Sequence, residues 1–144
     1  QTEIEILLSF GGQYCGIIDA KNYKTKFSLS ASLASHMASE YIPNYEGFKG
    51  RQIVFYGYVT AAQWNGERNL KKITQLAKRA IPDREIQGFI ISAPALLGFL
   101  DFCIDNDLPK EQRVKLFLKS IKNRGYSTVG ELLKTIKENH PDYQ

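Results

Sequence analysis

Residues 2–21 read TEIEILLSFGGQYCGIIDAK, two apolar runs separated by a pair of glycines. Glycine accepts the positive φ values that a tight hairpin needs, so Gly11 and Gly12 predict a turn between two antiparallel strands. The expected strands are residues 2–10 and 13–21. The sequence therefore opens with a predicted β-hairpin.

Four charged residues lie near the outer ends of these two strands. Side chains on a strand alternate with period two, so Glu3 and Glu5 share one face of the first strand, and Asp19 and Lys21 share one face of the second. An isolated Asp-x-Lys triplet is most often a solvated strand end with an incidental ion pair. Here an apolar strand precedes the triplet and an acidic strand lies across the glycine turn, which favours a metal site with its own cation.

The register of the hairpin decides which residue lies across from Asp19, because a slip of one residue moves every side chain to the other face. A two-residue glycine loop would put Ile4 opposite Asp19, with both glutamates turned away. A loop one residue longer, with a glycine at the left-handed bulge position, would put either Glu3 or Glu5 opposite Asp19. The alternation alone does not choose between the two glutamates.

The bulk composition is that of one globular domain. The 144 residues are 43% hydrophobic, which is enough for a core. No run approaches the roughly 18 apolar residues of a membrane span, so a cytoplasmic protein is expected. Cys15 and Cys103 lie far apart in apolar segments, which favours two buried thiols. His36 and His140 are too few and too scattered for a histidine metal centre, and His36 is expected at the surface.

Lysines and arginines gather in groups, although the formal net charge is only +4. Clustered cations neutralise phosphates and release counterions, which makes a polyanionic partner plausible. The plain alternative is that helices have solvated basic faces. The groups are Lys24, Lys26, Lys49, Arg51, Lys71, Lys72, Lys78 and Arg79, and then Lys115, Lys119, Lys122 and Arg124.

Beyond the hairpin, apolar periodicity and turn residues predict further helices and strands. The strand, helix, strand order between residues 51 and 92 implies a crossover connection, so these two strands are expected to be parallel and the sheet mixed. Gly125 is interpreted as the end of a helix, and Thr128 with Glu131 as a capping box that opens the next helix. The expected elements are a helix at 28–41, a turn at 43–47, a strand at 51–59, a helix at 67–80, a strand at 87–92, a helix at 94–103, a helix at 110–124 and a helix from 128 onward.

Together these features resemble the core of the PD-(D/E)xK nucleases. Thr2-Glu3 stands where that superfamily has Pro-Asp, and Asp19-Ala20-Lys21 is the (D/E)xK element. Residues 16–23 and 87–92 are similar to two strands in the cleavage domain of FokI-like type IIS restriction endonucleases. The resemblance covers most of residues 2–120. It implies an α/β (α+β) restriction-endonuclease-like core, a mixed β-sheet flanked by helices, with a helical C-terminal extension.

The resemblance also implies a Mg²⁺-dependent endodeoxyribonuclease that leaves a 5′-phosphate and a 3′-hydroxyl. Oxygen ligands for the cation would come from Asp19, the backbone carbonyl of Ala20, and Glu3 or Glu5, with the motif position favouring Glu3. Lys21 would orient the attacking water and stabilise negative charge. The expected catalytic residues are thus Glu3, Asp19 and Lys21, at a solvent-accessible centre. The alternative is a catalytically inactive nucleic-acid-binding domain of the same fold.

Expectations about assembly follow from the same resemblance. Residues 1–144 are interpreted as a single nuclease domain, a fragment of a larger bacterial enzyme whose DNA-recognition region precedes Gln1. The substrate is double-stranded DNA, and cutting both strands needs two such centres. In FokI-like domains the helix that here contains Met37 forms the dimer contact. Ser35 and Ser39 replace its charged pair, so a weak dimer is expected.

Overall fold

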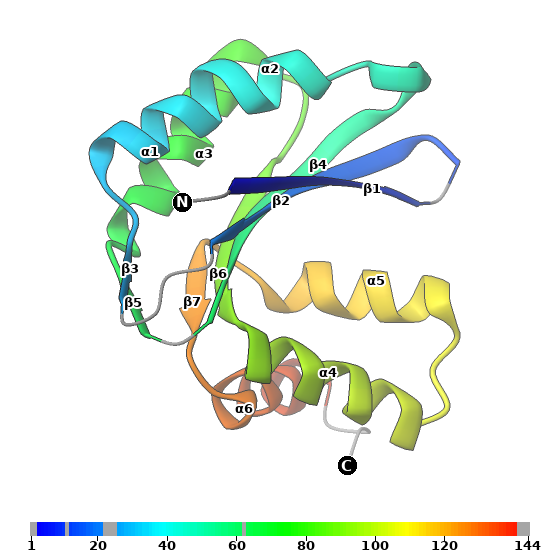
Figure 1. The fold of residues 1–144 in the computed structure, drawn as a ribbon. Helices are drawn as coiled ribbons and strands as arrows, with labels where there is room; N and C mark the ends of the chain where they lie inside the picture. The colour runs from blue at the N-terminus through cyan, green and yellow to red at the C-terminus, as the bar shows by residue number, and fades with distance from the viewer. Residues whose placement is uncertain (1–2, 11, 22–25, 62, 141–144) are drawn as a thin grey trace.

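The computed structural model describes residues 3–10, 12–21, 26–61 and 63–140, with the backbone alone for residues 3–10 and for Lys21. Within these residues a mixed five-stranded sheet lies between two layers of helices (Figure 1). No helix of this described part is long and apolar enough to cross a membrane. The predicted α/β class, with a mixed sheet flanked by helices, is confirmed.

The main sheet has the strand order β1-β2-β4-β6-β7. Only β1 and β2 pair in an antiparallel manner, and every later pair is parallel, including the predicted parallel pairing of β4 with β6. The parallel strands therefore share one carboxyl edge, where the carboxyl end of β2 also meets the start of β1. The strands of this sheet are β1 (Glu3–Phe10), β2 (Tyr14–Lys21), β4 (Gln52–Thr60), β6 (Gln87–Ser92) and β7 (Arg124–Tyr126).

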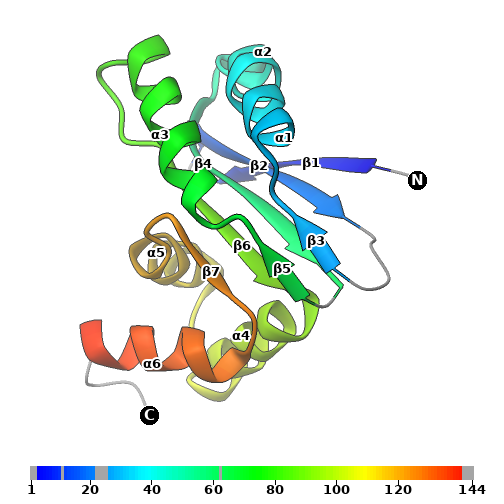
Figure 2. The same cartoon turned by 90° about the vertical axis from the view of Figure 1, so that its left-hand side faces the viewer.

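Helices cover both faces of the sheet, and each face has its own hydrophobic cluster (Figures 1 and 2). One layer holds α1 (Ala31–His36), the π-helix η1 (Met37–Tyr41), α2 (Ile42–Tyr45) and α3 (Arg68–Ala80). The other holds α4 (Ala93–Asp105), α5 (Lys110–Ser120) and α6 (Val129–Asn139). A short 3-10 turn, η2 (Phe48–Gly50), leads into β4.

The helix expected at 28–41 starts later and ends later than predicted. Ser30 is its N-cap, because the Ser30 hydroxyl accepts a hydrogen bond of 3.2 Å from the Leu33 N–H. Residues 43–45 were expected in a turn, yet they continue the helix as part of α2. A π-turn comes just before Pro43, with the Ile42 N–H bonded to the Met37 carbonyl. This wider turn accommodates a proline that would disrupt a regular helix interior.

The helix expected at 110–124 was predicted too long. It ends at Ser120, and Arg124–Tyr126 forms the edge strand β7, parallel to β6. Gly125 is therefore not a helix cap. A Cβ there would lie 2.0 Å from the Trp64 ring, so close packing requires the glycine. Asn123 makes the turn before β7 with φ of 58°, and its side chain accepts hydrogen bonds from the Gly88 N–H at 2.9 Å and the Thr74 hydroxyl at 2.8 Å.

A second, two-stranded ribbon was not predicted. It pairs β3 (Lys26–Ser28) with β5 (Gln63–Asn65) in parallel and extends from the carboxyl edge of the main sheet (Figure 2). Each strand has three residues, too short for an alternation signal. Gly66 follows β5 with φ of 85°, and a Cβ at this position would lie 2.3 Å from the Leu29 carbonyl oxygen. The ribbon and the start of α3 are thus packed tightly together.

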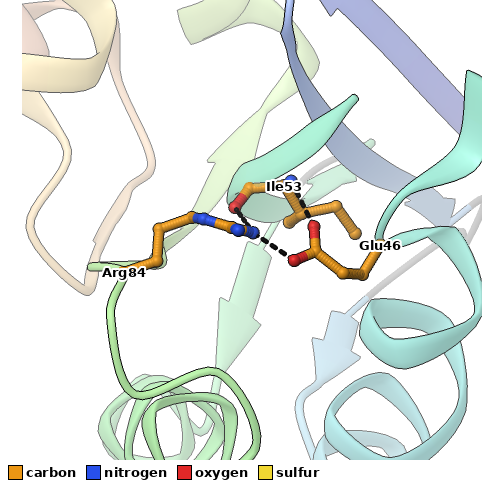
Figure 3. A network of polar contacts seen from close by, with 3 residues as sticks. All are labelled: Glu46, Ile53 and Arg84. Carbon is orange, nitrogen blue, oxygen red and sulfur yellow. Dashed lines mark hydrogen bonds and ion pairs between the residues drawn. The ribbon is translucent and has the colours of Figure 1, made fainter. Parts of the chain in front are cut away.

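A polar network lies at the amino end of β4, the end of the sheet opposite the carboxyl edge (Figure 3). The Glu46 carboxylate accepts a hydrogen bond of 3.0 Å from the Ile53 N–H and pairs with the Arg84 guanidinium. Arg84 also donates to the Ile53 carbonyl at 3.3 Å. One carboxylate thereby joins the end of α2, the start of β4 and the segment that follows α3.

Candidate active site

The turn of the hairpin sets its register. Phe10, the last residue of β1, pairs with Tyr14, the first of β2, so the loop holds three residues and not two. Gly12 has φ of 77°, in the left-handed region. This is the longer loop with a left-handed glycine that the sequence allowed, and Gln13 is its additional residue.

In this register Glu5 lies across from Asp19, and Glu3 lies across from Lys21. Ile4 pairs with Ala20, which excludes the arrangement in which both glutamates turn away. Residues that face each other across an antiparallel pair belong to the same face of the sheet. The backbone therefore brings all four charged positions to one face. The side chains of Glu3, Glu5 and Lys21 lie outside the described part of the chain.

Asp19 is buried, with 2% of its surface exposed, although the sequence placed it at a solvent-accessible centre and not in the core. It follows Cys15 and Ile17 at period two, and both of these belong to the hydrophobic cluster beneath α1 and α3. Its neighbour in register on β4 is Tyr58, which is 1% exposed. Carboxylates are rarely this deeply buried, because burial in an apolar environment costs free energy. The position therefore marks Asp19 as a candidate functional residue.

A row of polar residues follows the carboxyl edge of the parallel strands. Lys21, Thr60 and Ser92 are neighbours in register on β2, β4 and β6, and both hydroxyl residues are 2% exposed. In open α/β sheets, ligands bind outside this edge. The Ser92 hydroxyl donates to the Ser127 carbonyl at 2.7 Å and accepts from the Ala95 N–H at 3.1 Å, so it caps α4. Thr60 was not singled out from the sequence, since one threonine at the end of an apolar strand gives no signal.

His36, Cys15 and Cys103 do not belong to this row of polar residues. His36 is about half exposed on α1 and pairs with Glu40 at 2.9 Å, which agrees with its expected surface position. Cys15 and Cys103 are buried free thiols, as predicted. Burial raises the pKa of both thiols, and the nearby Glu46 carboxylate adds to the rise for Cys15. Among the side chains that the structure describes, which exclude Glu3 and Glu5, no three His, Cys, Asp or Glu residues gather into a metal site.

Comparison with known proteins identifies the family. The family described as "FokI, cleavage domain" matches residues 5–122, which is well over half of the chain. The matched stretch includes Glu5, Asp19 and Lys21, and Glu3 lies just before it. No curated protein and no solved structure matches. The match agrees with the resemblance noted in the sequence and with the mixed sheet flanked by helices. The chain therefore belongs to the family of FokI cleavage domains, the nuclease domains of type IIS restriction enzymes.

Proposed function

We propose that this domain hydrolyses phosphodiester bonds of double-stranded DNA with the help of a divalent cation, Mg²⁺. The proposed centre lies where the end of β2 meets the start of β1. The observation that carries the proposal is the hairpin register. It puts Glu5 across from Asp19, and Lys21 follows Asp19 by two residues on the same strand. Two acids and a lysine on one face of a hairpin, in a chain of this family, support a nuclease centre more than a solvated strand end.

The donor set fits Mg²⁺, a hard cation that prefers carboxylate and carbonyl oxygens. Asp19, the Ala20 carbonyl and one glutamate would hold it, and the bound cation would supply Lewis-acid catalysis and a more acidic water. Residues directly opposite in an antiparallel pair have Cβ atoms about 5 Å apart, which suits two carboxylates sharing one cation. The burial of Asp19 supports the fit, because a cation offsets the cost of burying a carboxylate.

Two glutamates remain candidates for the other ligand. The register supports Glu5, which lies across from Asp19 and within the matched stretch. The motif position supports Glu3, which lies across from Lys21. Both positions share the face of Asp19, so the second glutamate would be close enough to orient water or the first ligand.

Lys21 would act through its charge. A lysine is a cation at neutral pH unless it is strongly desolvated, so it can hold the attacking water and offset the negative charge that develops on the phosphate. Thr60, its neighbour in register, could donate a hydrogen bond to a phosphate oxygen. We assign Thr60 a positioning role at most.

A supercoiled-plasmid assay tests the proposal. The domain should nick the plasmid with Mg²⁺ and stop with EDTA, and Asp19→Ala should abolish nicking. The inactive binding domain, which is the alternative function, would retain the plasmid in a gel-shift assay and never nick it. Nicking that persists in Asp19→Ala would refute the proposed centre.

A further inference from the structure

The outward face of α3 carries only positive charge. Its residues Arg68–Ala80 include five cations and no acid. All five cations are exposed, whereas Leu70, Ile73 and Ala77 turn into the core. The cations are Arg68, Lys71, Lys72, Lys78 and Arg79. The other four cations follow Arg68 by three, four, ten and eleven residues, a spacing that keeps all five on one side of the helix.

This charge pattern costs the helix stability. Arg68 and its neighbours Lys71 and Lys72 stand in the amino-terminal half, where the helix dipole is positive and favours acids. Like charges three and four residues apart also repel each other. None of these three cations has an ion pair within 4.0 Å among the described residues, and Lys78 alone in the helix pairs with an acid, Glu85, at 3.2 Å. An anionic partner would offset both the repulsion between these cations and their unfavourable interaction with the helix dipole.

The helix α6 is a useful contrast on the other side of the sheet (Figure 1). It has Glu131 in its first turn and Lys137 in its last turn, which agrees with the helix dipole. Lys134 and Glu138 complete a set of two cations and two acids. The charge of α6 is thus balanced and follows the dipole, whereas α3 carries cations alone.

The cationic face starts beside the proposed centre. Tyr58 is the register neighbour of Asp19, and the Phe27 ring lies 5.5 Å from the Tyr58 ring. Phe27 in turn pairs with Trp64 in the β3–β5 ribbon, which leads through Gly66 into α3 (Figure 2). The amino terminus of α3 therefore lies a few side chains away from Asp19, at the carboxyl edge of the sheet.

A polar hollow lies at this junction. Its lining includes Ser28, Ser30, Asn65 and Arg68. Its walls are fixed, because the Asn69 side chain donates to the Leu29 carbonyl at 2.7 Å and the Leu29 N–H donates to the Asn65 carbonyl at 3.0 Å. Among the described residues that line it, Glu67 alone carries a carboxylate, and Glu67 accepts a hydrogen bond of 2.8 Å from the Gly125 N–H. Hydroxyl, amide and guanidinium groups on a rigid wall suit a phosphodiester backbone.

We propose that the cationic face of α3, from Arg68 onward, binds the phosphate backbone of duplex DNA and guides the strand to the Asp19 centre. The inference rests on the proposed nuclease function and adds to it the surface that holds the substrate. Each lysine on this face neutralises a phosphate without reading sequence.

Two double variants of equal charge change test the proposal. Lys71→Gln/Lys72→Gln removes two cations from α3, and Lys134→Gln/Lys137→Gln removes two from α6, where both lysines are also exposed. Binding of a labelled duplex is measured over a range of salt concentrations with EDTA present, so that no cleavage occurs. Thermal unfolding checks the fold, which glutamine should not harm, because it removes cations that repel each other near the start of the helix.

The α3 double variant should lower the slope of log affinity against log salt by about one per lost cation. At about 0.1 M salt its affinity should fall on the order of tenfold, equally for unrelated duplex sequences. The α6 double variant should bind as the wild type does.

Equal losses in the two double variants, or a larger loss in the α6 variant, would overturn the α3 surface and leave the nuclease proposal intact. An α3 variant that binds like the wild type would do the same. A wild-type domain that fails to bind duplex DNA even at low salt would overturn both, and the plasmid assay would then fail as well. The two failures are therefore distinguishable.

Discussion

At the scale of single residues, Asp19 combines burial with a position at the end of a strand. Its exposure of 2% would be costly for a carboxylate with only apolar neighbours. The same face of the hairpin holds the positions of Glu3, Glu5 and Lys21. A cluster of charge at the rim of an apolar layer is a common arrangement for a catalytic centre, because charge interactions are stronger where water is partly excluded.

The two glutamates are predicted to differ. Glu5→Gln should lower the rate of Mg²⁺-dependent plasmid nicking on the order of a hundredfold, because it removes an oxygen ligand across from Asp19. Glu3→Gln should have a smaller effect, since Glu3 lies across from Lys21. Nicking rates of the two variants at equal protein and Mg²⁺ concentration provide the comparison. The reverse order would identify Glu3 as the ligand, as the motif position suggests, and equal mild effects would exclude both.

Both thiols should be unreactive in the folded protein. Cys15 and Cys103 are fully buried, and burial raises the pKa of each thiol, so little thiolate is available. An aromatic disulfide reagent should modify both only after urea unfolds the domain. The raised pKa also affects the free energy of unfolding. The buried thiols contribute fully to it below the ordinary thiol pKa, and this contribution is lost as the pH rises above that pKa. Rapid modification of either thiol without urea would contradict the packing.

At the scale of elements, the network of Glu46, Arg84 and Ile53 should carry more stability than any exposed ion pair. Glu46 and Arg84 are 24% and 19% exposed. Glu46→Ala leaves the Ile53 N–H and the guanidinium without this acceptor, which should cost about 2 kcal/mol or more. The exposed pair of Lys78 and Glu85 is a matched control, and Glu85→Ala should cost less than about 0.5 kcal/mol.

Urea unfolding of the two variants measures both effects. Equal free energies of unfolding in Glu46→Ala and Glu85→Ala would mean that the network contributes no more than a surface pair. The plasmid assay should give wild-type activity for folded Glu46→Ala, because Ile53 lies at the amino end of β4 whereas Asp19 lies near the carboxyl end of the parallel strand β2.

Long elements with a clear period were predictable from the sequence, and short ones were not. The hairpin, β4, α3, β6 and α4 agree with the expected ranges within a few residues. The strands β3, β5 and β7 have three residues each, and their hydrogen bonds come from neighbours distant in sequence. No local pattern marks such strands, so residues 121–124 were assigned to a helix.

The candidate site was predictable in part. Asp19 and Lys21 could be selected because period two gives them one face. The choice between Glu3 and Glu5 could not be made, because it depends on whether the third loop residue is Phe10, before the glycines, or Gln13, after them. The burial of Asp19 was missed for another reason: it depends on α1 and α3, which pack over the hairpin from later in the chain.

At the scale of the whole molecule, the helix that was expected to form the dimer contact does not favour a strong dimer. Met37 is 1% exposed and belongs to the core, so it is not the surface residue that the expected dimer contact would need. The exposed side of this helix presents Ser35 and Ser39, which offer little apolar area and no charge. A stable interface usually has a buried apolar centre with aromatic or arginine anchors.

The domain should therefore sediment mainly as a monomer of 16.4 kDa at micromolar concentration. One centre cuts one strand, so nicked plasmid should accumulate before linear plasmid. The rate of linear product should rise more than in proportion to protein concentration. A stable dimer that persists on dilution would contradict this expectation, and so would linear product that forms without a nicked intermediate.

The central claim is that the hairpin edge holds a divalent cation, and binding of Mn²⁺ followed by electron paramagnetic resonance tests it most directly. Mn²⁺ takes the same oxygen ligands as Mg²⁺, and its binding requires neither DNA nor a second subunit. The wild-type domain should bind Mn²⁺, and Asp19→Asn should weaken binding on the order of tenfold or more. Lys21→Gln should bind as tightly as the wild type or more tightly, because it removes a neighbouring positive charge. Equal Mn²⁺ affinity in the wild type and in folded Asp19→Asn would contradict the account.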